Sequence, residues 1–215
     1  LSASVYCADP TAVEHDGRLY VYGTNDHQQF LANGRQGENH YGAIKSLVMF
    51  STDDLVNWTY HGTINVGALC GSWCYASWAP SVVSRREGDG LTLFYLYFSN
   101  SGAGVGVLTA TSPTGPWHSP LNRPLIDRNT PGVGLCSTPF DPGVAIDGNG
   151  TGWLAFGGGS ANSQGTKLMP GNARIVRLGA DMISVDGEAV EVPAPYHFEA
   201  NELNVMNGKL VLTYC

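Results

Sequence analysis

One hairpin pattern occurs four times in this chain, and the repetition restricts the folds open to it. Each copy has a short apolar run, a turn containing Asp-Gly or Asn-Gly, and a second apolar or aromatic run. The turns lie at Asp16-Gly17, Asp89-Gly90, 147–150 and Asn207-Gly208. Asp-Gly and Asn-Gly favour tight hairpin turns because both central residues of a type I′ turn need a positive φ. The pattern therefore predicts four β-hairpins.

The segments between these hairpins also have the character of strands. Residues 47–58, 105–117 and 173–192 each contain an apolar run, a polar turn and a second short extended run. No long stretch has an apolar period of 3.6 residues, so no long helix is expected. Each unit is therefore predicted to contain four antiparallel strands.

Four-stranded units in tandem predict an all-β chain and favour a β-propeller over a single β-sandwich. The expected blades are residues 5–66, 76–125 and 138–193, with a fourth from 197. The last residue, Cys215, falls in the second strand of the fourth unit. Because an open sheet edge invites aggregation, we expect a further C-terminal segment that completes the ring. The chain would then supply about three and a half blades.

Composition excludes several classes of protein. The 215 residues are 43% hydrophobic and 13% charged, which indicates one globular domain and not a disordered chain. A net charge of −7 argues against nucleic acid as a partner. The sequence has no apolar run long enough for a membrane-spanning helix, so no membrane partner is expected.

The cysteines suggest an oxidising compartment. Cys70 and Cys74 form a lone Cys-x3-Cys without the second pair of ligands typical of a zinc site. Two disulfides and one free thiol are the preferred interpretation of the five cysteines. Together with the sequons at Asn57 and Asn149, this predicts a secreted, extracellular glycoprotein.

Acidic residues occur near the start of three of the four units. Asp9, Asp141 and Glu199 stand seven or eight residues before a turn Asp or Asn, and Ala79 has this place in the second unit. The first strand of a propeller blade lines the central channel, so the three carboxylates are expected to converge. Asp-Pro pairs also begin strands and turns for purely structural reasons. Three such residues at one repeat position favour function, because clustered like charges repel one another.

Such a cluster suits glycoside hydrolysis, in which one carboxyl is protonated and another is ionised. Calcium binding is the competing chemistry, but the hairpins lack a dense Asp-x-Asp-x-Asp loop. The sequence contains no Gly-x-Ser-x-Gly, P-loop or His-Glu-x-x-His motif. Serine hydrolase, NTPase and zincin activities are therefore not supported.

Four motifs together resemble glycoside hydrolase family 43, in the family's order and over almost the whole chain. They are Ala8-Asp9-Pro10, Trp78-Ala79-Pro80, Phe140-Asp141-Pro142 and Phe198-Glu199-Ala200. The resemblance implies a five-bladed β-propeller and an inverting mechanism. The family contains α-L-arabinofuranosidases, β-xylosidases and arabinanases. Ser81 follows Pro80 where relatives often have an acidic residue, which puts the pocket of the second blade in doubt.

The resemblance also assigns catalytic roles. Asp9 would be the general base that activates water, and Glu199 the general acid. Asp141 would orient Glu199 and raise its pKa. Glu202 is a competing acid, but alternation along a strand turns it to the opposite side from Glu199. An inverting pair should lie roughly 6.5–9.5 Å apart.

Several other residues are candidates for binding substrate. Trp78 is expected to form an apolar wall for a sugar, or else to be a core residue. Phe140 and His197 neighbour the carboxylates, although alternation should turn Phe140 away from the side that Asp141 faces. Asn25 and His27 follow the first hairpin and are expected at the pocket rim. The 28–43 insertion and the 67–75 loop are expected to shape subsites.

The expected function is therefore release of L-arabinofuranose from plant cell-wall arabinoxylan. A β-xylosidase or arabinanase is the alternative within the family, and a non-catalytic carbohydrate-binding propeller is the alternative from another class. The partner is expected to be a polysaccharide or oligosaccharide. No cofactor or metal is expected for the chemistry. A structural calcium ion in the channel stays open, because the family's histidine near the central cation belongs to the fifth blade.

Overall fold

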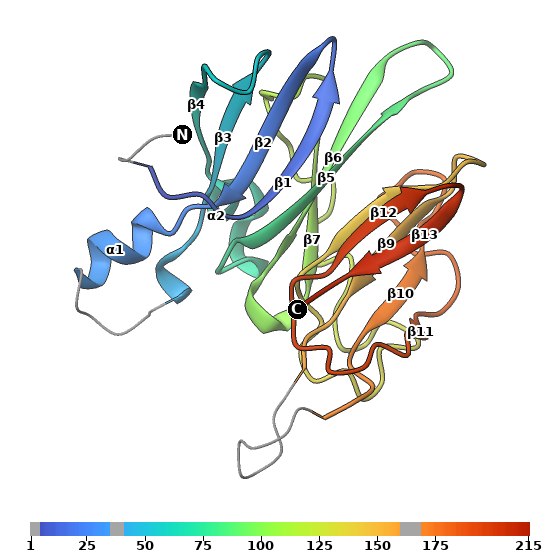
Figure 1. The fold of residues 1–215 in the computed structure, drawn as a ribbon. Helices are drawn as coiled ribbons and strands as arrows, with labels where there is room; N and C mark the ends of the chain where they lie inside the picture. The colour runs from blue at the N-terminus through green and yellow to red at the C-terminus, as the bar shows by residue number, and fades with distance from the viewer. Residues whose placement is uncertain (1–4, 35–40, 160–168) are drawn as a thin grey trace.

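The computed structural model describes residues 5–34, 41–159 and 169–215, which form four antiparallel sheets (Figure 1). The first contains β1 (Ala8–His15), β2 (Arg18–Thr24), β3 (Leu47–Thr52) and β4 (Thr59–Ile64). The second contains β5 (Trp78–Arg86), β6 (Thr92–Ser99) and β7 (Val105–Ala110). The third contains β8 (Gly143–Ile146), β9 (Gly152–Phe156), β10 (Arg174–Arg177) and β11 (Val190–Glu191). The fourth contains β12 (Glu202–Met206) and β13 (Lys209–Thr213).

Strands that follow one another in the chain are neighbours in every sheet. This order confirms the all-β class and the four hairpins. The edge strand predicted near Trp117 is reduced to a single bridge between Thr109 and His118. Pro116 and Pro120 flank this segment, and proline has no N–H to donate to a strand ladder. Trp117 is buried in the core instead.

Short helices interrupt the sheets. The α-helices are α1 (His27–Asn33) and α2 (Val66–Cys70), and the 3-10 turns are η1 (Tyr41–Ala43), η2 (Gly71–Trp73) and η3 (Ser101–Ala103). Helix α1 lies within the predicted 28–43 insertion, of which residues 35–40 are outside the described part of the chain. Helices of two turns or fewer leave too little periodicity to be recognised in the sequence.

The core lies between successive sheets. One cluster joins the first and second sheets through residues such as Tyr22, Leu47 and Phe94. A second cluster, which includes Tyr97 and Phe156, joins the second and third sheets. The third and fourth sheets meet through a smaller cluster. Each sheet is therefore held by apolar contact with its neighbours in the chain.

The entry into each sheet has the same unusual backbone. Asp9, Ala79, Asp141 and Ala200 have φ values of 48°, 36°, 50° and 60°. The register shifts at this place in β1 and in β5, as expected of β-bulges. Proline follows the first three of these residues, and Asn201 follows Ala200. We call these four positions the bulge residues.

This geometry corrects one prediction. Glu199 pairs with Cys215 through two backbone hydrogen bonds, as Ala8 pairs with Thr24 and Trp78 with Ser99. Glu199 therefore stands one residue before the position shared by Asp9 and Asp141. The count to the following turn missed this difference because Asp141 and Glu199 both lie eight residues before an Asn of a turn, Asn149 and Asn207.

None of the five cysteines forms a disulfide in the structure, so the two predicted disulfides are not confirmed. Cys74 Sγ instead donates to the Ala76 carbonyl at 3.2 Å. In the described part of the chain, no helix has the length and apolar character needed to span a membrane.

Candidate active site

A cavity of about 550 Å³ opens where the first strands of the sheets begin. Asp9, Asp141 and Glu199 reach it from the first, third and fourth sheets, and Asp26 is a fourth carboxylate in its wall. The rest of the lining is largely apolar and consists of Ala8, Thr24, Tyr41, Ile44, Trp78, Ala79, Phe140 and Phe198. The predicted convergence of the three carboxylates on one cavity is therefore observed.

Asp9 is held by the end of its own hairpin. The Thr24 hydroxyl donates to Asp9 Oδ2 at 2.8 Å. The same hydroxyl accepts the N–H of Ala79 at 2.8 Å. One side chain thus orients the carboxylate and joins the first sheet to the second.

Asp141 is the most enclosed of the three predicted catalytic carboxyls, with 8% of its surface exposed. Ser99 Oγ donates to Oδ1 at 3.4 Å, and the N–H of Ala200 donates to Oδ2 at 3.0 Å. Burial raises the pKa of Asp141 to about 7, and the nearby Glu199 charge adds to this rise. The hydrogen bond from Ala200 acts in the opposite direction. Asp141 is therefore poised between its neutral and ionised forms near neutral pH.

The pKa of Glu199 is also raised, first by burial and then by the charge of Asp9. The charge of either neighbouring carboxyl, Asp9 or Asp141, disfavours ionisation of Glu199, so the Glu199 carboxyl keeps its proton to a higher pH than an isolated one.

Glu202 lies in a second, smaller cavity of about 250 Å³. Its wall contains Pro10, Pro80 and Pro142, and it shares Asp9 and Asp141 with the larger cavity. Burial raises the pKa of Glu202 to about 7. Ser81 Oγ, at 3.5 Å from both carboxylate oxygens, acts against this rise. Glu199 and Glu202 therefore occupy different surroundings, as alternation predicts.

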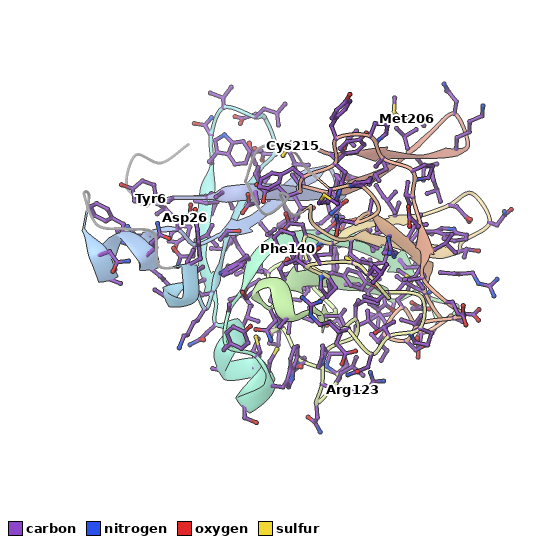
Figure 2. All side chains as sticks on the ribbon, turned by 90° about the horizontal axis from the view of Figure 1, so that it is seen from below. Tyr6, Asp26, Arg123, Phe140, Met206 and Cys215 are labelled. Carbon is purple, nitrogen blue, oxygen red and sulfur yellow. The ribbon has the colours of Figure 1, made fainter. Side chains whose placement is uncertain are left out.

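Two of the predicted substrate-binding residues line the larger cavity. The Trp78 ring packs against Tyr41, with 5.8 Å between ring centroids, and its Nε1 donates to the Tyr41 carbonyl at 2.9 Å. Phe140 shares the cavity wall with Asp141, and Figure 2 shows it near the middle of the molecule. The prediction that Phe140 turns away was wrong, because the bulge at Asp141 breaks the alternation.

The other three are not in this wall. Asn25 is buried and donates to Ser46 Oγ at 2.9 Å. His27 packs with Tyr6 and Phe30, at centroid distances of 5.7 and 5.9 Å. His197 is 4% exposed, and its Nε2 lies 2.9 Å from Asn201 Oδ1. A place just after the first hairpin, for Asn25 and His27, or beside Glu199, for His197, therefore did not put the side chain in this wall.

Asp26 and Phe198 also line the wall, although neither was predicted from the sequence. Asp26 lies beside α1 in Figure 2, and its pKa is raised by burial and then by Asp9. Thr24 and Asp26 are both wall residues, and the two-residue spacing after β2 was the signal for the second of them. Phe198 had no comparable signal, since the pairing of Glu199 with Cys215 is a tertiary feature.

No group of three or more His, Cys, Asp or Glu side chains with metal-binding geometry occurs within residues 5–34, 41–159 and 169–215. The cavity carboxylates are held by hydroxyl and backbone N–H donors.

Residues 3–215 match the family described as glycosyl hydrolases family 43. The chain belongs to this family. It is 41% identical to an arabinoxylan arabinofuranohydrolase of Bacillus subtilis over 97% of its length, and equally identical to one of Paenibacillus polymyxa. It covers 43% and 34% of these two relatives.

Solved structures agree with this assignment. The chain is similar to the Bacillus subtilis family 43 arabinoxylan arabinofuranohydrolase in complex with cellotetraose, with a TM-score of 0.85 and 40% identity. The match covers 97% of this chain and 45% of that one. A Clostridium thermocellum α-L-arabinofuranosidase matches with a TM-score of 0.78 and 38% identity, over 100% of this chain and 65% of the other. Family 43 neighbours are five-bladed β-propellers.

Proposed function

We propose that this protein is an inverting glycoside hydrolase that releases L-arabinofuranose from arabinoxylan. The observation that carries the proposal is the meeting of Asp9, Asp141 and Glu199, from three different sheets, in one cavity with aromatic walls. Like charges that share a cavity disfavour one another's ionisation, so such a set implies a use for both a neutral and an ionised carboxyl.

In this mechanism Glu199 is the general acid and Asp9 the general base. Asp9 removes a proton from a water molecule, and the water oxygen bonds to the anomeric carbon from one face of the sugar. Glu199 donates its proton to the glycosidic oxygen as the bond on the other face breaks. The raised pKa of Glu199 favours the protonated form that this step needs. Asp9 has both a positioning hydrogen bond from Thr24 and a place in the cavity wall.

Asp141 has a different role in the proposal. Its side chain accepts the N–H of Ala200, the residue that follows Glu199. We assign it to hold the backbone that carries the acid. Trp78, Phe140 and Phe198 present apolar ring surface to the cavity, which suits the C–H faces of a sugar.

The choice of arabinoxylan rests on the relatives. Both Bacillus subtilis and Paenibacillus polymyxa relatives are named arabinoxylan arabinofuranohydrolases, and the solved Clostridium thermocellum relative is named an α-L-arabinofuranosidase. Weaker relatives are named xylosidase/arabinosidase, at 30% identity. A β-xylosidase is therefore the second candidate.

The proposal extends to the fold and the location of the protein. The four described sheets would be successive blades of a five-bladed propeller, with the bulge residues around its channel. The protein would act outside the cell, where arabinoxylan is found. Asn57 and Asn149 of the two sequons are exposed, as glycosylation would require.

The test is to incubate the full-length protein with wheat arabinoxylan, linear arabinan and xylobiose, and to identify the released sugar. Free arabinose with inverted configuration from arabinoxylan alone supports the proposal. Xylose from xylobiose indicates the β-xylosidase, and arabinose or its oligomers from linear arabinan indicate an arabinanase. Binding without any product indicates a carbohydrate-binding propeller.

A further inference from the structure

We propose that Asn201, held by His197, is a positioning residue that sets the acid Glu199 relative to Asp141. The inference rests on the proposed function, in which Glu199 is the proton donor. Its basis is a hydrogen bond that recurs between successive sheets and is replaced by a different one between the third and fourth sheets.

At the first two junctions a hydroxyl at the end of the second strand binds the bulge residue of the next sheet. Thr24 Oγ1 accepts the N–H of Ala79 at 2.8 Å. Ser99 Oγ accepts the N–H of Asp141 at 2.8 Å. Each hydroxyl also donates to a cavity carboxylate, Thr24 to Asp9 and Ser99 to Asp141. Both hydroxyls therefore join two sheets and also orient a cavity carboxylate.

The third junction cannot repeat this contact. The residue equivalent to Thr24 and Ser99 is Gly157, whose N–H donates to the Phe140 carbonyl at 2.7 Å. A Cβ at Gly157 would lie 2.1 Å from the Asn172 carbonyl oxygen, and its φ is 119°. No hydroxyl side chain fits there. The N–H of the next bulge residue, Ala200, binds Asp141 Oδ2 instead.

Asn201 replaces the missing hydroxyl. It stands where the other three sheets have proline, and it is 4% exposed. Its Nδ2 donates to the Asp141 carbonyl at 2.9 Å and to the Gly157 carbonyl at 2.7 Å. One amide thus ties the fourth sheet to the backbone of Asp141 and to the end of β9.

His197 fixes the orientation of this amide. Because Asn201 Nδ2 faces two carbonyl acceptors, Oδ1 must be the atom that faces His197 Nε2, at 2.9 Å. Nε2 therefore carries the hydrogen and donates it. His197 Nδ1 has no hydrogen-bond partner among the described residues, and the ring packs edge-on against Tyr214 at 5.4 Å. The hydrogen bond of this buried histidine side chain is thus made to Asn201.

Glu199 lies directly between these two anchors, with His197 two residues before it and Asn201 two residues after it. This pair, Asn201 and His197, which we call the clamp, thereby determines where the Glu199 backbone lies against the third sheet. Proton donation is sensitive to the position of the acid, and a displacement of about 1 Å can cost on the order of 100-fold in rate. Loss of the clamp should therefore impair proton donation more than substrate binding.

The experiment compares two substrates in the full-length protein. Arabinoxylan has a poor leaving group that needs protonation, whereas 4-nitrophenyl α-L-arabinofuranoside has a good one that needs little. Asn201→Ala should lower kcat on arabinoxylan by about 10- to 100-fold, with a several-fold smaller loss on the aryl substrate and little change in KM. Glu199→Gln should show the same selectivity with a larger loss.

Asn100→Ala is the matched control. Asn100 is also 4% exposed, and it makes three hydrogen bonds to the backbones of Trp73, Tyr75 and Ala76. Within the described part of the chain it makes no hydrogen bond to a cavity carboxylate, so its loss should affect the two substrates equally. Thermal unfolding followed by circular dichroism places the variants on one scale of stability.

If Asn201→Ala does not fold, His197→Phe decides the question, because it removes the donor to Asn201 and keeps a ring against Tyr214. His197→Gln should restore part of the arabinoxylan activity by supplying a new N–H. Equal losses on both substrates in either clamp variant, or no loss, overturn the inference while Glu199→Gln stays selective. Loss of selectivity in Glu199→Gln itself overturns the proposed function instead.

Discussion

Glu199 and Glu202 are separated by two residues, and burial raises the pKa of both, yet they stand in different regions of the molecule. Glu199 faces the cavity of about 550 Å³ with aromatic walls. Glu202 faces a space of about 250 Å³ walled by prolines. A raised pKa alone therefore does not distinguish a catalytic acid from a buried carboxyl, and access for a sugar does.

Glu202 occupies a position in its sheet at which side chains of other sheets make contacts with a neighbouring sheet. Thr11 and Ser81 lie two residues after the bulge residues of the first two sheets. Glu202 likewise lies two residues after the bulge residue Ala200. Thr11 Oγ1 accepts the N–H of Val82 at 3.2 Å, and Ser81 Oγ accepts that of Val144 at 3.0 Å. Polar side chains at this position thus join neighbouring sheets. Glu202 shares the position of joining residues, whereas Glu199 shares that of wall residues such as Trp78 and Phe140.

The largest expected effect separates these two carboxyls. Glu199→Gln should lower kcat on arabinoxylan by about 10² to 10⁴-fold, because no other group donates to the leaving oxygen. Glu202→Gln should stay within several-fold of the parent protein. Initial rates of arabinose release measure both. A larger loss in Glu202→Gln would break the distinction between the two cavities.

The next largest effect concerns the carboxylates Asp9 and Asp141 near Glu199. Asp9→Asn removes a negative charge and should lower the pKa of Glu199. Carboxyl titration followed by ¹³C NMR measures the shift. Asp141→Asn should lower kcat by about 10- to 100-fold through misplacement of the acid. An unchanged Glu199 pKa in Asp9→Asn would show that the charge of Asp9 does not act on Glu199.

Stability should reveal the burial of Glu202. Its folded pKa of about 7 exceeds the ordinary value of 4.5, so the folded state binds more protons between these values. The free energy of unfolding should then fall as pH rises from about 4.5 to 7, by roughly 1 to 3 kcal/mol from this group. Glu202→Gln should flatten this decline in urea titrations at pH 5 and pH 8. An unchanged slope would show that water reaches Glu202 freely.

The smallest effect tests the wall of the larger cavity. Trp78→Ala should raise KM about 10-fold with a smaller change in kcat, because ring contact with a sugar contributes to binding in the ground state as well as the transition state. Trp58→Ala is a control, since Trp58 is absent from the wall of either cavity. Steady-state kinetics on the aryl arabinofuranoside measure both. An equal KM in the parent and Trp78→Ala would remove Trp78 from the binding site.

The sequence by itself determined the hairpins and the set of carboxylates. Asp-Gly and Asn-Gly turns act over a few residues, so their effect is visible without the fold, as at Asp16 and Asn207. Asp9 and Asp141 were recognisable because each precedes a proline in a repeated motif. The predicted place of Trp78 in the cavity wall followed from the same repeat.

The tertiary structure decided the rest, because it depends on residues far apart in the chain. The bulges at Asp141 and Ala200 turned Phe140 into the cavity and placed Glu199 one position earlier than counted. Asp26 lines the cavity because it follows the end of β2. His197 is absent from the wall and is hydrogen-bonded to Asn201. Positive φ values and contacts between sheets have no local period, so only the folded chain shows which side chains line the cavity and which residues hold them.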